Sequence, residues 1–473
     1  MKAMKVFLLA VLALGVFSCE KDPAPIVDPT ASFPTDPATG ATVIGNAAGG
    51  DFEIKQNLTL IASKKYLLKG FVYVTDGFTL TIEPGTIIKG DKDTKSTLII
   101  ERGAKIIADG TADKPIVFTS NKPKGSRAYG DFGGVVLAGK APVNQTNPTM
   151  EGGIRNSYGG TDPNDNSGSM KYVRIEFPGI AFQTDREING LTLYGVGAGT
   201  TLDYIQVSYS GDDSFEWFGG TVNAKHLIAH RGFDDDFDTD FGYKGKVQFG
   251  VALRDPAIAD KSTSNGFESD NFDPGTPATA LITEPVFANM SAFLTGATTL
   301  PTSNGSGDHG RGMHLRRNTK TSIFNSVLVG YPEGLRLDGN ATWANVQSGA
   351  LNLEGIVISN DVTKTGAGVA LRNANAAGEV ATFTLADLTA WFNTPAKKNS
   401  TPALADLKLN ASTFSLTAPN FVPQTGSPLL TDAIWSNTKA ADAFFEKTAY
   451  KGAFGATNWA TGWTNFDPQN TDY

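Results

Sequence analysis

The chain has 473 residues, and its 48 Asp and Glu against 40 Lys and Arg give a net charge of −8 at pH 7. An acidic chain without a basic cluster argues against a nucleic-acid partner. Beyond its first residues no stretch stays apolar for about 18 residues, which argues against a channel or transporter. The 52 glycines, frequent β-branched runs and near absence of helical periodicity predict an all-β protein.

The first residues have the pattern of a processing signal. Two lysines precede an apolar run at residues 6–16 that is too short to span a bilayer. The next letters, VFSC at 16–19, resemble the lipobox of bacterial lipoproteins, and Cys19 is the single cysteine of the chain. We therefore expect a signal peptide at 1–18 and a lipid anchor on Cys19, the alternative being a plain secretory signal. Loss of the signal would change the net charge to −10.

Residues 19–50 are rich in Pro, Asp, Thr and Gly and predict an extended tether. The charged Glu20-Lys21-Asp22 resembles the export tags of surface-exposed lipoproteins in some Gram-negative bacteria. Ordinary linker polarity is the alternative. The expected location is the cell outer membrane, with the protein facing outward.

An apparent 18-residue repeat covers residues 80–133 and places Gly85 and Gly103 at one corner, where a positive φ is expected. The repeat would stack Leu80, Leu98 and Ile116, and beside them Ile82, Ile100 and Phe118. The motif LTIEPGT, followed by GAKIIADGT and KPIVFTS, resembles the opening coils of right-handed parallel β-helix surface proteins. The resemblance implies that fold for residues 51–440 and leaves activity open.

The tail at 450–470 resembles the end of a large set of Gram-negative β-helical lipoproteins, some of them mislabelled as transporters. That set has no settled chemistry, so the resemblance, which covers about residues 55–473, implies fold and location. We assign 441–473 to a C-terminal capping segment. A helix is predicted at Leu385–Phe392, with Thr384 as its N-cap, and should cover the end of the solenoid.

Residues 139–170 form a long polar excursion. Within it Asp162, Asn164 and Asn166 resemble the start of a calcium loop, but the glycine comes one position late and the final acid is missing. We expect a solvated loop there.

Residues 204–220 and 226–242 repeat one pattern at an offset of 22, a strand, an acidic corner and a second strand that ends in glycine. This is typical of stacked coils. Extending the alignment downstream gives an inward column of Phe215, Phe237, Phe267, Met313 and Leu335. A second inward column contains Trp217, Thr239, Ser269, Leu315 and Leu337.

The opposite face carries a charged stripe, acidic in the middle and basic at one end. Like charges about 5 Å apart repel, and folding does not require them, so we predict a ligand-binding stripe. Its members are Glu216, Asp238, Asp240, Glu268, Asp270, His314, Arg316, Arg336 and Asp338.

The acidic corners suggest calcium, because hard cations take six to eight oxygen ligands. The candidates are Asp212, Asp213, Asp234, Asp235 and Asp236. Alternatively, these side chains cap turns. The basic residues Arg311, His314, Arg316, Arg317 and Arg336 could clamp an anion or neutralise the neighbouring acids.

Two smaller questions concern aromatic and histidine side chains. Trp217 would stack on a sugar ring only if the register slipped by one residue. His226 and His230 share a strand face and predict no metal site.

Three functions are open on the sequence alone. The first is a lipid-anchored surface binding or adhesion protein, whose stripe holds a glycan or a partner protein. The second is a Ca²⁺-dependent polysaccharide lyase, with Arg254, Arg311 or Arg316 as base, or a glycoside hydrolase. The third is an accessory subunit of an outer-membrane complex, which should expose a wide apolar patch.

Overall fold

The computed structural model describes residues 28–473 apart from 184–185, 273–279, 304–306, 362–367 and 376–377. Cys19, the predicted signal peptide and the first part of the tether lie outside these residues, so those predictions stay predictions. In the part that is described, neither helix has the length and apolar character needed to cross a bilayer.

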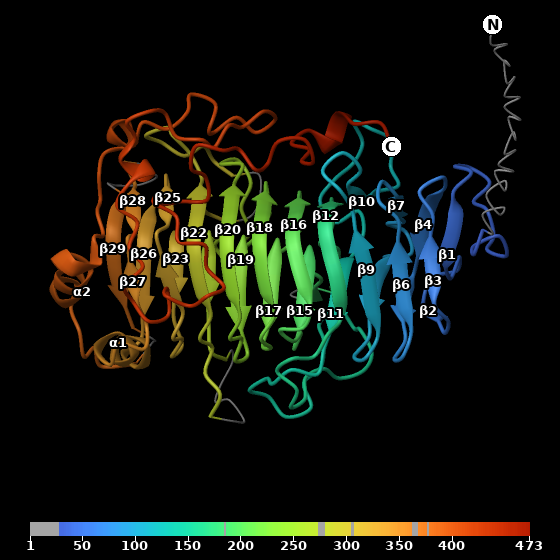
Figure 1. The fold of residues 1–473 in the computed structure, drawn as a ribbon, viewed down its shortest axis with the longest axis horizontal. Helices are drawn as coiled ribbons and strands as arrows, with labels where there is room; N and C mark the ends of the chain where they lie inside the picture. The colour runs from blue at the N-terminus through green and yellow to red at the C-terminus, as the bar shows by residue number, and fades with distance from the viewer. Residues whose placement is uncertain (1–27, 184–185, 273–279, 304–306, 362–367, 376–377) are drawn as a thin grey trace, which may run out of the picture.

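The chain winds into a right-handed parallel β-helix with three faces, as predicted (Figure 1). The first face contains β3 (Leu58–Leu60), β6 (Thr79–Ile82), β9 (Lys105–Asp109), β12 (Gly168–Glu176), β16 (Thr201–Ser208), β18 (Asn223–His230), β20 (Lys246–Leu253), β22 (Val286–Phe293), β24 (Ser322–Phe324) and β27 (Leu353–Glu354).

The five long strands of this face bend and continue into the second face. On the second face, the first coils have separate strands, which are β1 (Thr42–Gly45), β4 (Lys65–Lys69), β7 (Ile87–Gly90) and β10 (Ile116–Ser120). The last coils also have separate strands there, β25 (Val327–Val329) and β28 (Val357–Ser359). β9 pairs with the beginning of β12 and β10 with its end, which shows that β12 spans both faces.

The third face is a separate sheet. It contains β2 (Asp51–Ile54), β5 (Phe71–Val74), β8 (Thr97–Ile100), β11 (Gly134–Ala138), β15 (Leu191–Tyr194), β17 (Phe215–Phe218), β19 (Phe237–Asp240), β21 (Phe267–Ser269), β23 (Arg311–Leu315), β26 (Glu333–Asp338) and β29 (Val369–Ala374). A small hairpin, β13 (Ala181–Gln183) with β14 (Arg186–Glu187), stands apart.

The bend between the first two faces is made by one residue per coil with positive φ, which is uncommon outside glycine. These residues are Tyr172, Tyr204, His226, Phe249, Asn289 and Asn325. The rings of the first four stack along the helix axis, with centroids 4.4 Å apart for Tyr172–Tyr204 and 4.2 Å for Tyr204–His226. His226 also bonds Asp203 at 2.8 Å, so its ring is already held by neighbours within the fold.

The apparent 18-residue repeat was wrong as a coil length. Leu80 pairs with Leu58 and Ile106, whereas Leu98 pairs with Val72. The three repeat units lie on β6, β8 and β10, hence on three different faces, and their second column is equally wrong. On every face, a strand of alternating apolar and polar residues is followed by a turn, so the alignment matched one face with the next. The predicted positive φ is present, at 87° for Gly85 and 93° for Gly103.

The two inward columns from Phe215 to Leu335 and from Trp217 to Leu337 are confirmed in register. Every member is at most 2% exposed. The centroid of the Phe237 ring lies 5.7 Å from that of Phe215 and 5.2 Å from that of Phe267. These ladders are the interior of the solenoid in its central coils.

Helix α2 (Leu385–Phe392) has the predicted bounds and the predicted N-cap Thr384, and the structure adds a capping box between Thr384 and Asp387. Phe383, Leu388 and Phe392 join the interior cluster, so this segment covers the last coil. A second short helix, α1 (Asn340–Gln347), was not predicted, and it also packs on this end through Trp343.

The remaining chain runs back along the second face toward the first coils (Figure 1). It contains four short 3₁₀ turns, at Pro395–Lys397, Leu404–Leu407, Pro428–Leu430 and Pro468–Asn470. Phe421, Phe454 and Trp463 pack on outward apolar residues such as Val251 and Phe293. The strands therefore extend from Thr42 to Ala374, whereas we had expected the β-helix at 51–440. Residues 441–473, expected as a C-terminal capping segment, pack on a side of the solenoid.

Truncation of one interior ring tests the ladder. Phe237→Ala should lower the free energy of unfolding by about 3–5 kcal/mol, because neighbouring coils cannot close the cavity. Thermal and urea unfolding measure the change. Val380→Ala, at an 85% exposed position, is the control and should shift stability by less than about 0.5 kcal/mol. Equal effects of the two substitutions would contradict the ladder.

Candidate functional site

The charged stripe lies on the outward side of the third face, and its first row is in register. Glu216 pairs with Asp238, Asp238 with Glu268, Glu268 with His314, and His314 with Arg336. Two residues further along the chain, on the same outward side, the second row contains Asp240, Asp270, Arg316 and Asp338. The structure therefore brings all nine predicted stripe residues onto one surface. That surface is more covered than expected, since Glu216 is 8% and His314 4% exposed.

At the basic end, the side chains neutralise acids of the same surface. Arg316 contacts Glu268 at 2.6 Å and Asp270 at 2.8 Å. His314 lies 3.0 Å from Glu268 and 3.5 Å from Asp338. Arg317 pairs with Asp270, and Arg336 holds Glu333 through two bonds of 2.7 Å. The charge-compensation alternative therefore describes this end better than an anion clamp.

The acidic end is different. The corner carboxylates Asp212, Asp213, Asp234 and Asp235 meet Glu216, Asp238 and Glu268 in one cleft of about 160 Å³, which we call the acidic cleft. Its other lining residues are Glu151, Asn189, Ser262 and Thr263.

Three groups of carboxylates in the acidic cleft have oxygens within 4.8 Å of one another. They are Asp212 with Asp213 and Asp234, Asp213 with Glu216 and Asp238, and Asp235 with Asp238 and Glu268. Of these, only Glu268 forms an ion pair within 4.0 Å with a Lys, Arg or His of the described residues. Such an arrangement of oxygens can hold a hard cation.

Asp236 does not join the cleft, although the sequence grouped it with the other corner acids. It is fully buried and lies 3.0 Å from the equally buried guanidinium of Arg254. Strand alternation would turn the residue before the inward Phe237 outward, but the Asp236 side chain turns to the inside of the corner, where Arg254 neutralises it. Arg254 is thereby also removed from the candidates for a catalytic base.

A ladder of short side chains fixes the corners of the acidic cleft. Asp213 Oδ1 accepts a hydrogen bond from the Asp235 N–H at 2.8 Å, and Asp235 Oδ1 accepts one from the Asn265 N–H. Asn189 and Asn265 continue the same pattern to the coils on either side. One oxygen of each Asp therefore serves the turn, as the capping alternative proposed, while both residues still line the cleft.

Burial raises the pKa of Asp212, Asp213 and Glu216 well above the usual range, and the adjacent carboxylates raise it further. The same causes act on Asp235 and Asp238. Burial raises the pKa of Asp234 to about 7.

Glu268 behaves differently from the other carboxylates of the acidic cleft. Burial raises its pKa, but the His314 hydrogen bond and the Arg316 charge outweigh burial and lower the pKa below its usual value. The boundary between the uncompensated and the compensated part of the stripe therefore lies at Glu268.

The polar excursion forms one wall of this surface, and the sequence did not predict that role. Met150, Ile154 and Tyr158 are buried against the third face, while Asp162, Asn164 and Asn166 are exposed as expected. Glu151 brings a further carboxylate to the acidic cleft. The apolar residues of MEGGI at 150–154 and the tyrosine of NSY at 156–158 were the sequence signals that this loop packs against the third face.

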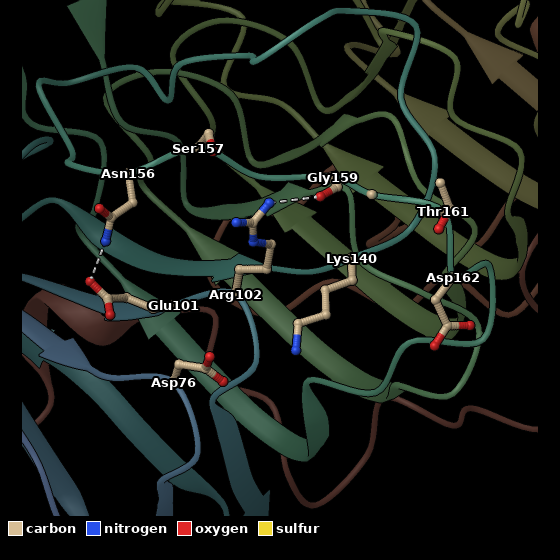
Figure 2. Close-up of a pocket in the computed structure, with 10 residues that line it drawn as sticks. Asp76, Glu101, Arg102, Lys140, Asn156, Ser157, Gly159, Thr161 and Asp162 are labelled. Carbon is tan, nitrogen blue, oxygen red and sulfur yellow. Dashed lines mark hydrogen bonds between the residues drawn. The ribbon is translucent and has the colours of Figure 1, made fainter.

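Two further clefts lie along the same excursion. Gln145, Thr149 and Glu151 line one of about 500 Å³ over Tyr194, Phe218 and Phe241. The other, of about 530 Å³, lies beside Arg102 and Lys140 (Figure 2). Trp217 lies in neither and is fully buried, so it offers no surface to a sugar.

Comparison with known proteins agrees with this architecture. A family model described as a pectate-lyase-like β-helix domain matches residues 52–402. The match covers more than half of the chain, so the chain belongs to this family of β-helix domains. No curated protein matches the chain.

Among solved structures, the Dettilon tailspike protein (gp208) is similar at 10% identity and a TM-score of 0.24. The aligned region covers 66% of this chain and 62% of the tailspike chain, less than two thirds of its length.

The raised pKa values predict how stability depends on pH. Between about pH 4 and pH 7 the folded acidic cleft keeps protons that the unfolded chain has released, so stability falls as pH rises. In EGTA, the thermal midpoint should therefore be several degrees lower at pH 7.5 than at pH 5. Asp234→Asn should flatten this slope. A midpoint that rises over this interval, or a slope unchanged by Asp234→Asn, would contradict the assignment.

Proposed function

We propose that this protein binds a polysaccharide on the outer side of its third face through a Ca²⁺ ion held in the acidic cleft. The observation that carries the proposal is the set of six carboxylates, from two successive coils, that form no ion pair with a cationic side chain of the described residues. They are Asp212, Asp213, Glu216, Asp234, Asp235 and Asp238. Self-repulsion in a half-closed cleft is costly unless protons or a cation compensate it.

The donor set fits calcium in particular. All the ligands are oxygens, and they come from side chains on neighbouring coils, as the irregular shell of Ca²⁺ allows. Asp234 Oδ1 and Asp238 Oδ1 are buried without a hydrogen-bond partner among the described residues, so they are free to accept a metal. The cleft opens to solvent on one side, where a bound ion can share ligands with a partner.

A glycan is the partner that this arrangement favours. Hydroxyl and carboxylate oxygens of sugars complete the coordination of a hard cation, and an acidic surface repels an anionic ligand until the ion is bound. Membership in a pectate-lyase-like domain family supports a polysaccharide over a protein. Binding would therefore depend on calcium.

Catalysis has less support than binding. Oxygens of Glu216 and Asp238 lie within 4.8 Å, closer than the carboxyl separation of roughly 6.5–9.5 Å used by inverting hydrolases. Arg316, a candidate lyase base, is held by two carboxylates that keep it charged, and Arg311 lies 3.8 Å from Glu333. A lyase or hydrolase remains the second candidate because the acids with raised pKa could transfer protons.

An accessory subunit has no matching surface in the described part of the chain. Its exposed large apolar side chains are Val380 and Leu385, both near α2, and they do not form a wide patch. A lipid anchor on Cys19 at the outer membrane is part of our proposal and rests on the VFSC motif. It would hold the β-helix at the cell surface with the third face free to meet polysaccharide.

Calcium should stabilise the protein and support glycan binding. At a Ca²⁺ concentration about 100 times Kd, the gain is about 2.7 kcal/mol, measurable as a rise of the thermal midpoint at pH 7.5. Asp238→Asn should remove most of this rise and the calcium-dependent signals on a glycan array. Asp113→Asn, the same change on an exposed turn, should remove neither. An equal midpoint in Ca²⁺ and EGTA would overturn the metal site.

The lipid anchor has its own test. Cys19→Ser should abolish incorporation of labelled palmitate in cells and release the protein from the membrane fraction, because no other thiol is available for acylation. Ser18→Ala should retain both properties. Unchanged labelling of the Cys19 variant would exclude the anchor.

A further inference from the structure

The cleft beside Lys140 contains charged side chains without ion-pair partners, and they come from three successive coils (Figure 2). Asp76 follows β5, Arg102 follows β8 and Lys140 follows β11. None of the three forms an ion pair within 4.0 Å with any other described residue. This contrasts with Arg155 in the excursion and with Arg316 and Arg336 on the same face, all of which are paired.

The Asp76 and Lys140 side chains converge at Gly103, where a Cβ would come within 2.0 Å of Asp76 Oδ1 and 2.8 Å of Lys140 Nζ. Arg102 lines the same cleft but points toward Gly159 (Figure 2). The guanidinium of Arg102 donates one hydrogen bond to the Gly159 carbonyl at 3.1 Å, which fixes its orientation and leaves further N–H groups available (Figure 2).

The fold builds the walls of this cleft firmly. Lys140 is fixed at its backbone by Asp165 Oδ2, which accepts its N–H at 2.9 Å. Glu101, 8% exposed, accepts bonds from Arg155 at 3.0 Å and Asn156 at 2.8 Å through the same oxygen, Oε1. The excursion is thereby attached to the coils on both sides of the opening.

The chemistry of the lining selects the ligand. No residue that lines this cleft has an apolar or aromatic side chain, which disfavours lipids and aromatic ligands. Arg102 and Lys140 can bind one anionic group, the Arg with two parallel N–H bonds. Asp76, Asp162 and the amide of Asn156 offer acceptors and donors to hydroxyl groups. The volume of about 530 Å³ is within the usual range of small-molecule sites.

We infer that this cleft is a second, metal-independent binding site for a sugar unit that carries an anionic substituent, a carboxylate or a sulfate. Arg102 and Lys140 bind the substituent, and Asp76 accepts hydrogen bonds from the ring hydroxyls. The site shares no residue with the acidic cleft, so it goes beyond the calcium-dependent function proposed above.

Calorimetric titration of the full chain in EGTA tests the site, with glucuronate, glucose 6-sulfate, glucose and inorganic sulfate as separate probes. At least one anionic sugar should bind, and glucose and sulfate alone should bind at least about tenfold more weakly. The sugar that binds better identifies the substituent. If all four probes fail to bind, or if glucose binds as well as the anionic sugars, the inference is overturned. EGTA keeps this result independent of the calcium site.

Variants separate specific recognition from general charge. Lys140→Ala and Arg102→Gln should each weaken anionic-sugar binding about tenfold. The thermal midpoint should change little, because neither side chain has an ion pair to lose and Arg102 loses a single hydrogen bond to Gly159. Lys105→Ala, at an exposed position on β9, is the matched control and should leave affinity unchanged. Asp76→Asn should weaken sugar binding yet strengthen binding of inorganic sulfate. An equal loss of affinity in the Lys140 and Lys105 variants would show that binding depends only on net charge, and it would overturn the site.

Discussion

Parallel pairing of successive coils determines this structure. Each strand of the third face lies about 4.8 Å from the next, and residue pairs with residue without a shift from β17 to β26. Residues many positions apart in sequence therefore become direct neighbours, and one type of side chain at one position becomes a ladder. Phe215, Phe237 and Phe267 form such a ladder on the inside, and Glu216, Asp238 and Glu268 form one on the outside.

The inner ladder stabilises the fold, whereas the outer ladder destabilises it. Stacked aromatic rings inside the solenoid remove apolar surface from water and stabilise the fold. Stacked carboxylates outside repel one another, and burial in the acidic cleft raises the pKa of Asp213, Glu216 and Asp238. Downstream the same row changes to His314 and Arg336, and every charge there finds a partner. The repulsion is therefore confined to three coils, which gives that segment its chemical character.

The sequence was sufficient to predict the features that depend on register alone. The 22-residue offset between 204–220 and 226–242 placed the first two members of each row correctly, because the two coils are equal in length. Alignment on the small residue before each apolar one placed the downstream members, where the spacing is looser, and the strand pairing confirms them. The N-cap at Thr384 is a local signal, and the sequence also predicted it correctly. The first coils misled the alignment, since similar strand and turn patterns recur on all three faces. There, spacing alone cannot distinguish one face from the next.

Segments that leave the register could not be placed from the sequence. The excursion returns to bring Glu151 to the acidic cleft, and the turn before β21 brings Ser262 to it. Asp236, next to Asp235 in the chain, turns the other way and meets Arg254 inside the corner. None of these placements can be deduced from a periodic pattern, because each depends on how a loop closes in space.

The difference between strands stacked in register and segments that leave the register explains where a binding site can form on a β-helix. The stacked faces fix rows of side chains at one spacing, and such rows by themselves form only a flat surface. The excursion between β11 and β12 adds the missing wall, with Arg155 holding it to Glu53 at 2.6 Å and to Glu101 at 3.0 Å. Concave sites therefore occur where an attached loop meets an uncompensated row, and on this protein both the acidic cleft and the cleft beside Lys140 satisfy that condition.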